Sequence, residues 1–263
     1  MKRVSGICFC LFFMSTTLLF AQKQKKPAAV PAGPAVEFKK YSYPFYTIIN
    51  GNTTTLTGCF IKVKDSTYFV TARHHFYTPV NEMRKLSNVM IFVEPDNKKS
   101  NAKALSLNMK IQRLIPVCID SVCTDIVLLP ITIPNDYSIH YAELPGNEKM
   151  EGHKMTIAGY VQDSINITET KFHSIVARDS SYFLTDHSVS NEQTGSPVLM
   201  ASGAKGKPEV VLAGIYSGRE LSKEHFNKGL VASASVIHAY FFPAPKPVLT
   251  APVKQIHKKK KKA

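Results

Sequence analysis

The chain has 263 residues, of which 44% are hydrophobic and 20% are charged, a composition typical of a globular protein. The formal net charge of +14 is concentrated at the two ends: seven of the 33 Lys and Arg residues lie in residues 1–40 and seven in residues 246–263, which leaves 19 cations and 18 of the 19 acids between them. A nearly neutral middle argues against a basic fold that binds a phosphate backbone, so we expect no specific nucleic-acid partner.

Residues 1–21 have the pattern of a secretory signal peptide. Lys2 and Arg3 precede an apolar run that ends at Ala21, a small residue suited to cleavage. Cleavage there predicts a secreted or periplasmic protein; the alternative is an uncleaved anchor, because the run is barely long enough to span a bilayer. Residues 22–40 follow as a linker rich in Pro, Ala and Lys, which we expect to be disordered because it has too few large apolar residues to form a core.

The pattern of residues 41–243 is typical of an all-β protein. Short apolar or alternating segments, rich in Val, Ile, Thr, Tyr and Phe, are separated by Asn, Asp, Ser, Pro and Gly. This pattern predicts about eleven or twelve strands. A polar, turn-rich stretch at residues 133–151 divides the segments. We therefore predict two packed antiparallel β-barrels, residues 41–136 and 137–243, with a short C-terminal helix from Val236.

Residues 244–263 form a basic tail, which we expect to be disordered, with five consecutive lysines before Ala263. Two interpretations of the lysine block stay open: electrostatic binding to an anionic surface, or a solvated tail. The solvated tail is favoured because no aromatic residue interleaves the lysines.

Three cysteines remain if the signal peptide is removed: Cys59, Cys118 and Cys123. The last two would form a disulfide if the chain turns between them, but their spacing does not decide it. The sequence contains no CxxC and no HExxH motif, so it predicts no metal site and no cofactor.

Three segments contain, in chain order, a histidine, an aspartate and a threonine that could together form a catalytic triad. His74 follows an apolar strand in YFVTARHHF, Asp125 opens the apolar strand of CTDIVLLPI, and Thr194 lies in NEQTGSPVLM on a tight loop. On an all-β chain of this size, this is the order of the triad in chymotrypsin-like hydrolases.

The chain thus resembles the trypsin-like (chymotrypsin-fold) serine peptidases, in particular bacterial secreted members, from about Leu56 to Tyr240. VTARH is similar to the family's TAAH, TDIVLLPI to DIALL and TGSPV to SGSPV. VVLAGIYSG and EGHKMTIAGY resemble two further strands of the family, and all five motifs stand in the family's order.

The resemblance implies the roles of the candidate catalytic residues. His74 would be the general base, Asp125 would orient its ring, and Thr194 would stand at the position of the nucleophile. The backbone N–H groups of Glu192 and Thr194 would form the oxyanion hole. Taken singly, His74 could equally be a turn histidine and Asp125 a strand-capping acid; the five motifs in register favour the catalytic interpretation.

The resemblance also implies a substrate-binding region. Ser188 would lie at the base of the specificity pocket, Tyr216 in its wall, and Ser217 close to the acid of the triad. Because none of these is acidic, a trypsin-like preference is not expected. Arg219 would face the extended peptide and select an acidic side chain or partly close the cleft; the alternative is a solvent-facing arginine. His75 stands where disulfide-bearing members have a cysteine.

The chain departs from the family's GDSGGP or GNSGSP at three positions. Thr194 replaces the nucleophilic serine, and its methyl group restricts χ1. Glu192 replaces a glycine of the oxyanion hole. Gln193 replaces the aspartate that pairs with a new amino terminus in zymogen-activated members, so we expect no proteolytic zymogen switch.

These features predict a secreted, monomeric peptidase of reduced activity that hydrolyses peptide bonds in proteins or peptides. The alternative is a catalytically inactive relative that binds a peptide or protein. His74 and Asp125 favour the first hypothesis, whereas Glu192 and Thr194 favour the second.

Overall fold

The computed structural model describes residues 37–93, 104–107, 113–134, 137–146, 150–162, 164–176, 179–203 and 209–243. All of them belong to one compact unit that begins at Val36. The predicted signal peptide, nearly all of the predicted linker and the predicted basic tail lie outside the described residues. In the described part, no helix is long and apolar enough to cross a membrane.

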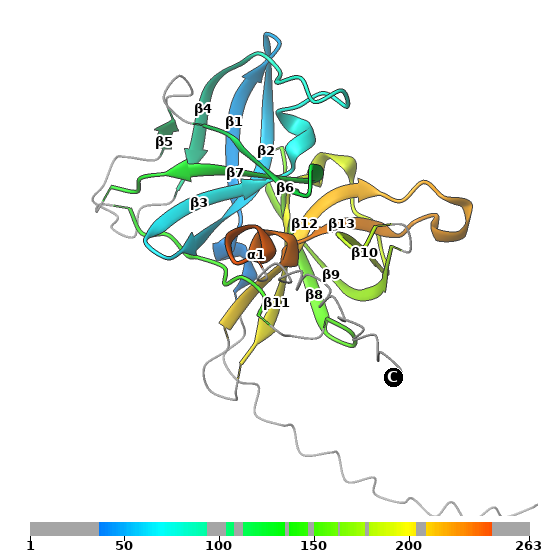
Figure 1. Cartoon of the computed structure of the whole chain (residues 1–263). Helices are drawn as coiled ribbons and strands as arrows, with labels where there is room; N and C mark the ends of the chain where they lie inside the picture. Colours follow the sequence, from blue (N-terminus) through cyan, green and yellow to red (C-terminus); the bar gives the residue numbers. More distant parts are fainter. Residues whose placement is uncertain are drawn as a thin grey trace, which may run out of the picture. The chain divides into compact units, whose positions relative to one another are not determined.

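The first half of the fold is an antiparallel sheet of seven strands in the order β5-β4-β1-β2-β3-β7-β6 (Figure 1). The strands are β1 (Tyr43–Ile49), β2 (Asn52–Val63), β3 (Ser66–Thr71), β4 (Leu86–Phe92), β5 (Ala104–Leu107), β6 (Ile115–Ile119) and β7 (Val122–Ile131). The 12-residue strand β2 pairs with β1 up to Gly58 and with β3 from Cys59 onward. One long strand therefore joins the two parts of this sheet.

Aromatic side chains fill the core of the first half. Phe45, Phe60, Phe69 and Phe76 are fully buried, and the Phe69 ring meets those of Phe45 and Phe60 edge to face at 5.3 and 5.2 Å between centroids. Such edge-to-face pairs add to the stabilisation from buried apolar area. Phe76 follows directly after the segment that carries His74, so this packing anchors the start of the candidate site.

The second half is a closed barrel in the order β10-β13-β12-β11-β8-β9. Its strands are β8 (Lys154–Val161), β9 (Ser164–Ile175), β10 (Tyr182–Thr185), β11 (Pro197–Ser202), β12 (Glu209–Arg219) and β13 (Gly229–Ser233). Four short 3₁₀ helices interrupt the chain: η1 (Phe38–Tyr41), η2 (Arg73–His75), η3 (Asn191–Gln193) and η4 (Lys223–His225). The helix α1 (Ser235–Phe241) follows β13.

The two halves pack through a shared apolar cluster. It includes Cys59, Ile61 and Val70 from the first sheet together with Leu199 and Leu212 from the barrel, all fully buried. Residues of α1 complete the same cluster, which explains the position of the helix against the sheets. Burial of this surface from both sides fixes the two halves against each other.

The predicted all-β fold with a short C-terminal helix is confirmed. The second half closes into a barrel as predicted. In the first half, however, no ladder joins the edge strands β5 and β6 among the described residues, so these strands form an open seven-stranded sheet. β5 and β6 have only four and five residues, which gives each edge little backbone for further pairing.

The β6–β7 hairpin settles the pairing that the cysteine spacing left open. Cys118 lies directly opposite Cys123 in the ladder, and the two form a disulfide. Asp120 and Ser121, in the tight turn between them, have positive φ angles of 47° and 70°. Cys59 is buried and free.

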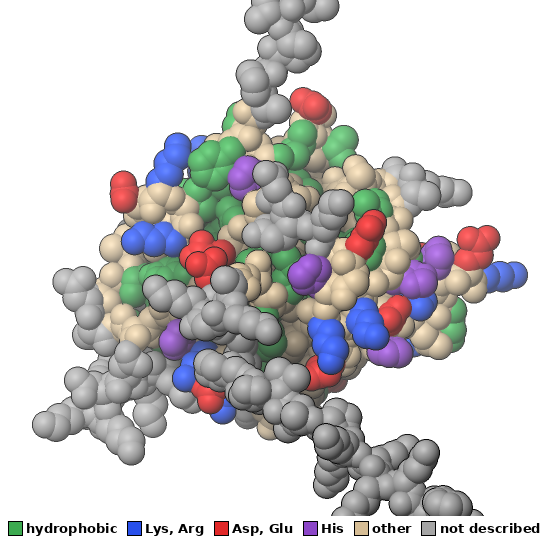
Figure 2. All heavy atoms as spheres, turned by 90° about the horizontal axis from the view of Figure 1, so that it is seen from below, with side chains coloured by type: hydrophobic (Ala, Val, Ile, Leu, Met, Phe, Trp, Pro, Cys, Tyr) green, Lys and Arg blue, Asp and Glu red, His purple; other side chains and the backbone are tan. Residues whose placement is uncertain are grey.

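Charges of both signs are interspersed on the face of the molecule shown in Figure 2, where Lys and Arg side chains lie among Asp and Glu side chains. The described residues on this face therefore form no single extended basic patch.

Candidate active site

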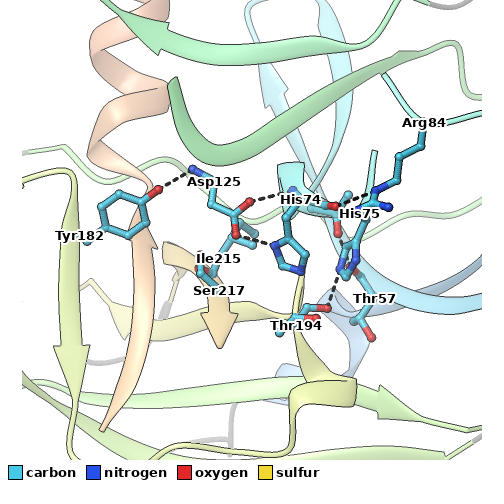
Figure 3. A network of polar contacts seen from close by, with 10 residues as sticks. Thr57, His74, His75, Arg84, Asp125, Tyr182, Thr194, Ile215 and Ser217 are labelled. Atoms are coloured by element: carbon cyan, nitrogen blue, oxygen red, sulfur yellow. Dashed lines mark hydrogen bonds and ion pairs between the residues drawn. The ribbon is translucent and has the colours of Figure 1, made fainter. Parts of the chain in front are cut away.

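His74 and Asp125 come together because strands β3 and β7 are neighbours. His74 lies in η2, which begins two residues after β3 ends, and Asp125 lies in β7; the ladder pairs Thr71 of β3 with Val127 of β7. The His74 backbone N–H donates to Asp125 Oδ1 at 2.8 Å, and His74 Nδ1 lies 2.7 Å from Asp125 Oδ2 (Figure 3). One carboxylate thus holds both the backbone and the ring of His74.

This contact determines what the His74 ring can do. A carboxylate oxygen only accepts hydrogen bonds, so in the neutral ring Nδ1 carries the hydrogen and Nε2 has the lone pair. The His74 side chain is 43% exposed and that of Asp125 is 16% exposed. A sheltered acid and an open ring are the arrangement that a histidine general base requires.

Tyr182 on β10, in the other half of the fold, forms a hydrogen bond with the backbone of Asp125. The backbone N–H of Asp125 donates to the Tyr182 hydroxyl at 2.8 Å. Burial, together with the charge of Asp125, raises the pKa of Tyr182 to about 12, so the phenol is neutral at physiological pH. No motif in the sequence identified Tyr182, because a single tyrosine at the start of a strand has no distinctive spacing.

Thr194 follows η3 directly and presents its backbone to the first half of the fold. Its carbonyl accepts a hydrogen bond from His75 Nε2 at 3.1 Å, and the next residue, Gly195, donates its N–H to the Tyr216 carbonyl at 2.8 Å. A Cβ atom on Gly218 would lie 3.8 Å from Thr194 Cγ2, so the threonine methyl group faces β12. The structure therefore brings Thr194 to the same site as His74 and Asp125 (Figure 3).

The Thr194 hydroxyl is not paired with His74, the candidate general base, in the described part of the structure. Among the described residues, no hydrogen bond joins Thr194 Oγ1 to His74 in this structure. Because Thr194 is half-buried and His74 is open, rotation about χ1 of Thr194 is the movement that would bring its hydroxyl toward Nε2.

The two N–H groups expected to form the oxyanion hole are both engaged within the η3 turn. Glu192 N–H donates to Ser190 Oγ at 3.3 Å, and Thr194 N–H donates to the Asn191 carbonyl at 3.2 Å. An oxyanion hole needs donors that point at the position of the developing charge. The hole is therefore closed in this structure, and rotation of the peptide between Asn191 and Glu192 would be needed to open it.

Two buried polar atoms lie without a partner beneath this loop, as far as the described residues show: Gln193 Nε2 and Ser196 Oγ. Both side chains pack against Gly159 of β8, where a Cβ atom would collide with them. A buried donor or acceptor left unpaired costs about 1–3 kcal/mol. The closed loop is therefore destabilised by these unpaired groups. A rearranged loop that gave them hydrogen-bond partners would be free of this destabilisation.

The residues expected to bind substrate lie in different environments. Ser188 is half-buried, whereas Tyr216 is fully buried in the barrel core. The Tyr216 hydroxyl donates to the Val189 carbonyl at 3.0 Å and accepts the Val189 N–H at 3.2 Å, so its ring offers no surface to a substrate here. The Ser217 hydroxyl donates to the Ile215 carbonyl at a long 3.5 Å.

Arg219 is exposed at the end of β12, as is the Phe226 ring, over which its guanidinium lies at 5.9 Å. The Arg219 guanidinium is thus within cation–π distance of the Phe226 ring. No group of three or more His, Cys, Asp and Glu side chains in the described part could hold a metal ion.

Comparisons with known proteins identify the fold. No family model and no curated protein matches the chain. Among solved structures, it is similar to the thermostable serine protease AL20 from an extremophilic microorganism, with a TM-score of 0.55, 10% identity, and 77% of this chain and 95% of that chain covered. It is also similar to the protease Anisep from Arthrobacter nicotinovorans, with a TM-score of 0.55, 11% identity, and 77% and 94% covered. The chain therefore has the chymotrypsin-like fold of serine proteases.

Proposed function

We propose that this chain is a peptidase that cleaves peptide bonds by acyl transfer, with His74 as general base, Asp125 as its orienting acid and Thr194 as nucleophile. The observation that carries the proposal is the pair of hydrogen bonds that the Asp125 carboxylate accepts from the backbone and the ring of His74. A general base needs a ring that is held in one tautomer, and it needs the other ring nitrogen, here His74 Nε2, to be accessible. A module that only binds peptides needs neither feature. The proposal includes export of the chain, which is supported by the pattern of residues 1–21.

The reaction would proceed in two halves. Thr194 Oγ1 attacks the substrate carbonyl carbon while His74 Nε2 takes the hydroxyl proton, which forms a tetrahedral oxyanion. His74 then gives this proton to the leaving amine as the C–N bond breaks, leaving an ester on Thr194. Water attacks the ester with the help of the same base, which releases the acid and restores the hydroxyl.

The closed loop predicts a slow enzyme. The loss of one oxyanion donor costs roughly 2.7–4 kcal/mol of transition-state stabilisation in known cases. In this chain, substrate binding would have to release the N–H groups of Glu192 and Thr194 from their partners in the η3 turn before they could stabilise the oxyanion. This step adds to the barrier, as does the restricted χ1 of a threonine nucleophile.

A binding module is the second candidate function. The observation that favours it is the same closed loop, because binding of a peptide beside His74 needs no oxyanion hole. In that case the hydrogen bonds within the η3 turn would stay intact when a peptide binds.

A fluorophosphonate probe distinguishes the two candidates. The probe forms a covalent bond to an activated hydroxyl and releases fluoride, so it needs no knowledge of the substrate. We expect labelling of the purified chain at Thr194, and no labelling of the folded variants Thr194→Ala and His74→Ala. If the folded chain stays unlabelled over long incubation and leaves a mixed peptide library intact, the peptidase proposal is wrong and the binding module is preferred.

A further inference from the structure

We propose that His75 is a positioning residue, which holds the Thr194 carbonyl and thereby sets the nucleophile loop in place beside His74. This role rests on the proposed function, because the alignment of the loop with His74 matters only if Thr194 reacts. His75 is only 9% exposed, and its Nε2 lies 3.1 Å from the Thr194 carbonyl oxygen. The His75 and His74 rings lie 4.3 Å apart between centroids (Figure 3).

The contact crosses the fold. His75 belongs to η2 of the first half, and Thr194 lies 119 residues later in the second half. Consecutive residues of one short helix therefore carry the candidate base and the donor that holds the candidate nucleophile. Because His75 ties the loop to η2, a movement of η2 would carry the loop with it, which keeps the spacing between His74 and Thr194 constant.

The chemistry of the contact determines the state of the His75 ring. A carbonyl oxygen only accepts hydrogen bonds, so Nε2 carries the hydrogen. Burial lowers the pKa of His75 to about 3, and the neighbouring His74 and Arg84 lower it too, against the opposing effects of the Thr194 carbonyl and of Asp125. The ring is therefore neutral at physiological pH, and it does not oppose the positive charge that His74 takes up when it accepts the hydroxyl proton.

The loop backbone at Gly195 packs closely against the first half of the fold. A Cβ atom on Gly195 would lie 2.5 Å from Thr71 Oγ1, 2.8 Å from the Thr57 carbonyl oxygen and 3.0 Å from His75 Nε2. Thr71 Oγ1 is itself fixed by a hydrogen bond to the Thr57 carbonyl at 2.6 Å. The loop backbone thus lies directly on β2, β3 and the His75 ring, with His75 supplying the hydrogen bond to the nucleophile residue.

Two substitutions separate the hydrogen bond from the volume of the ring. His75→Gln retains an N–H donor at a similar distance from the backbone, whereas His75→Leu fills the space without a donor. The first readout is amide hydrogen exchange at Gly195, whose N–H donates to the Tyr216 carbonyl. The reference is the amide of Leu212, which donates to the Glu143 carbonyl away from the loop.

We expect His75→Leu to speed exchange at Gly195 by about tenfold and to leave Leu212 unchanged, while His75→Gln stays close to the unaltered chain. Equal exchange at Gly195 in all three proteins would overturn the proposal. If His75→Leu does not fold, the His75 ring in the unaltered chain decides: a slowly exchanging Nε2 proton in the nuclear magnetic resonance spectrum supports the proposal, and an Nδ1-protonated ring refutes it.

The second readout is fluorophosphonate labelling at saturating probe, measured in a Thr194→Ser background. We expect His75→Leu to lower the maximal labelling rate about tenfold with little change in the probe concentration at half-saturation, and His75→Gln to restore it. A parallel loss in both variants would contradict positioning through the hydrogen bond. If the exchange result holds but no protein is labelled, the positioning contact is supported and the proposed peptidase function is wrong.

Discussion

The methyl group of Thr194 restricts the hydroxyl on which the proposed mechanism depends. It faces β12 near Gly218, and a β-branched side chain has few χ1 rotamers available. We expect Thr194→Ser to raise the second-order rate of fluorophosphonate labelling by about tenfold, equivalent to ~1.4 kcal/mol of barrier. The rate is measured from label incorporated over time, with Thr194→Ala as the unlabelled control. A folded serine variant that labels no faster than the unaltered chain would contradict this expectation.

Gly195 has a second constraint besides its φ of +88°. A Cβ atom there would meet Thr71 and the Thr57 backbone, whereas Gly51, with the same φ of +88°, has nothing within 4 Å. We expect Gly51→Ala to lower the free energy of unfolding by about 1–2 kcal/mol. Gly195→Ala should cost about 1–3 kcal/mol more, because overpacking adds to the backbone strain.

Urea unfolding of the two alanine variants measures this difference directly. Because the two glycines have the same φ, the extra cost at Gly195 reports the contacts of its Cβ with Thr71, Thr57 and His75. Equal losses in the two variants would mean that the loop yields easily, which is incompatible with tight packing of Gly195 against Thr71 and the Thr57 backbone.

At the scale of elements, η3 is a single turn whose hydrogen bonds occupy the donors that catalysis would need. Ser190 caps this turn by accepting the Glu192 N–H on its hydroxyl. We expect Ser190→Ala to lower the free energy of unfolding by only about 0.5 kcal/mol, at the low end for a lost cap, while it raises the labelling rate severalfold. The opposite signs follow because the cap stabilises the closed loop, whereas labelling requires the open one.

Ser222→Ala is the matched control for this prediction. Ser222 precedes η4 in the same way, but its side chain makes no capping hydrogen bond. This variant should leave both the labelling rate and the stability unchanged. A Ser190→Ala variant that is labelled more slowly than the unaltered chain would show that the turn supports the site rather than blocking it.

The strands themselves could be predicted well, but their partners could not. The apolar run of β7 and the segment before His74 were both recognised from their pattern. The pairing of β3 with β7 brings His74 within 2.7 Å of Asp125, and only the resemblance implied that these two residues lie together. Alternation of side chains indicates a strand and its buried face, but register depends on contacts between residues far apart in sequence.

At the scale of the whole molecule, the buried neutral His75 couples stability to pH. Its pKa is lowered from 6.5 to about 3 by burial, so the folded chain binds this proton less readily than the unfolded chain. The contribution to stability is therefore complete above about pH 6.5 and is lost as the pH falls toward 3. The groups that face the ring, namely His74, Asp125 and Arg84, remain the same in a His75 variant.

We expect His75→Gln to lose less stability than the unaltered chain between pH 7 and pH 4. The difference should be a few kcal/mol, from about 1.4 kcal/mol for each pH unit over which only the unfolded state is protonated. Urea unfolding of both proteins at the two pH values measures it, and subtraction cancels the carboxylates that titrate in both. A pH dependence that is identical in the two proteins would show that His75 is not held neutral by burial.

The amino-acid sequence by itself determined the all-β class and the short final helix, because alternation and turn residues are properties of neighbouring residues. It also determined the chain order of His74, Asp125 and Thr194, which is read directly from the sequence. It also exposed Glu192 as a departure from the family pattern. It could not show that the donors of Glu192 and Thr194 are engaged within the η3 turn, or that the Tyr216 ring is enclosed in the barrel.

Those properties were decided only by the tertiary structure. Cys118 bonds to Cys123 because the β6–β7 turn places them opposite each other, and Tyr182 reaches Asp125 because the two halves pack together. His75 became part of the site only when the fold placed the Thr194 carbonyl within 3.1 Å of its ring. Each of these contacts depends on where the packed backbone brings residues that are not neighbours in the sequence, and burial then requires their polar groups to find partners.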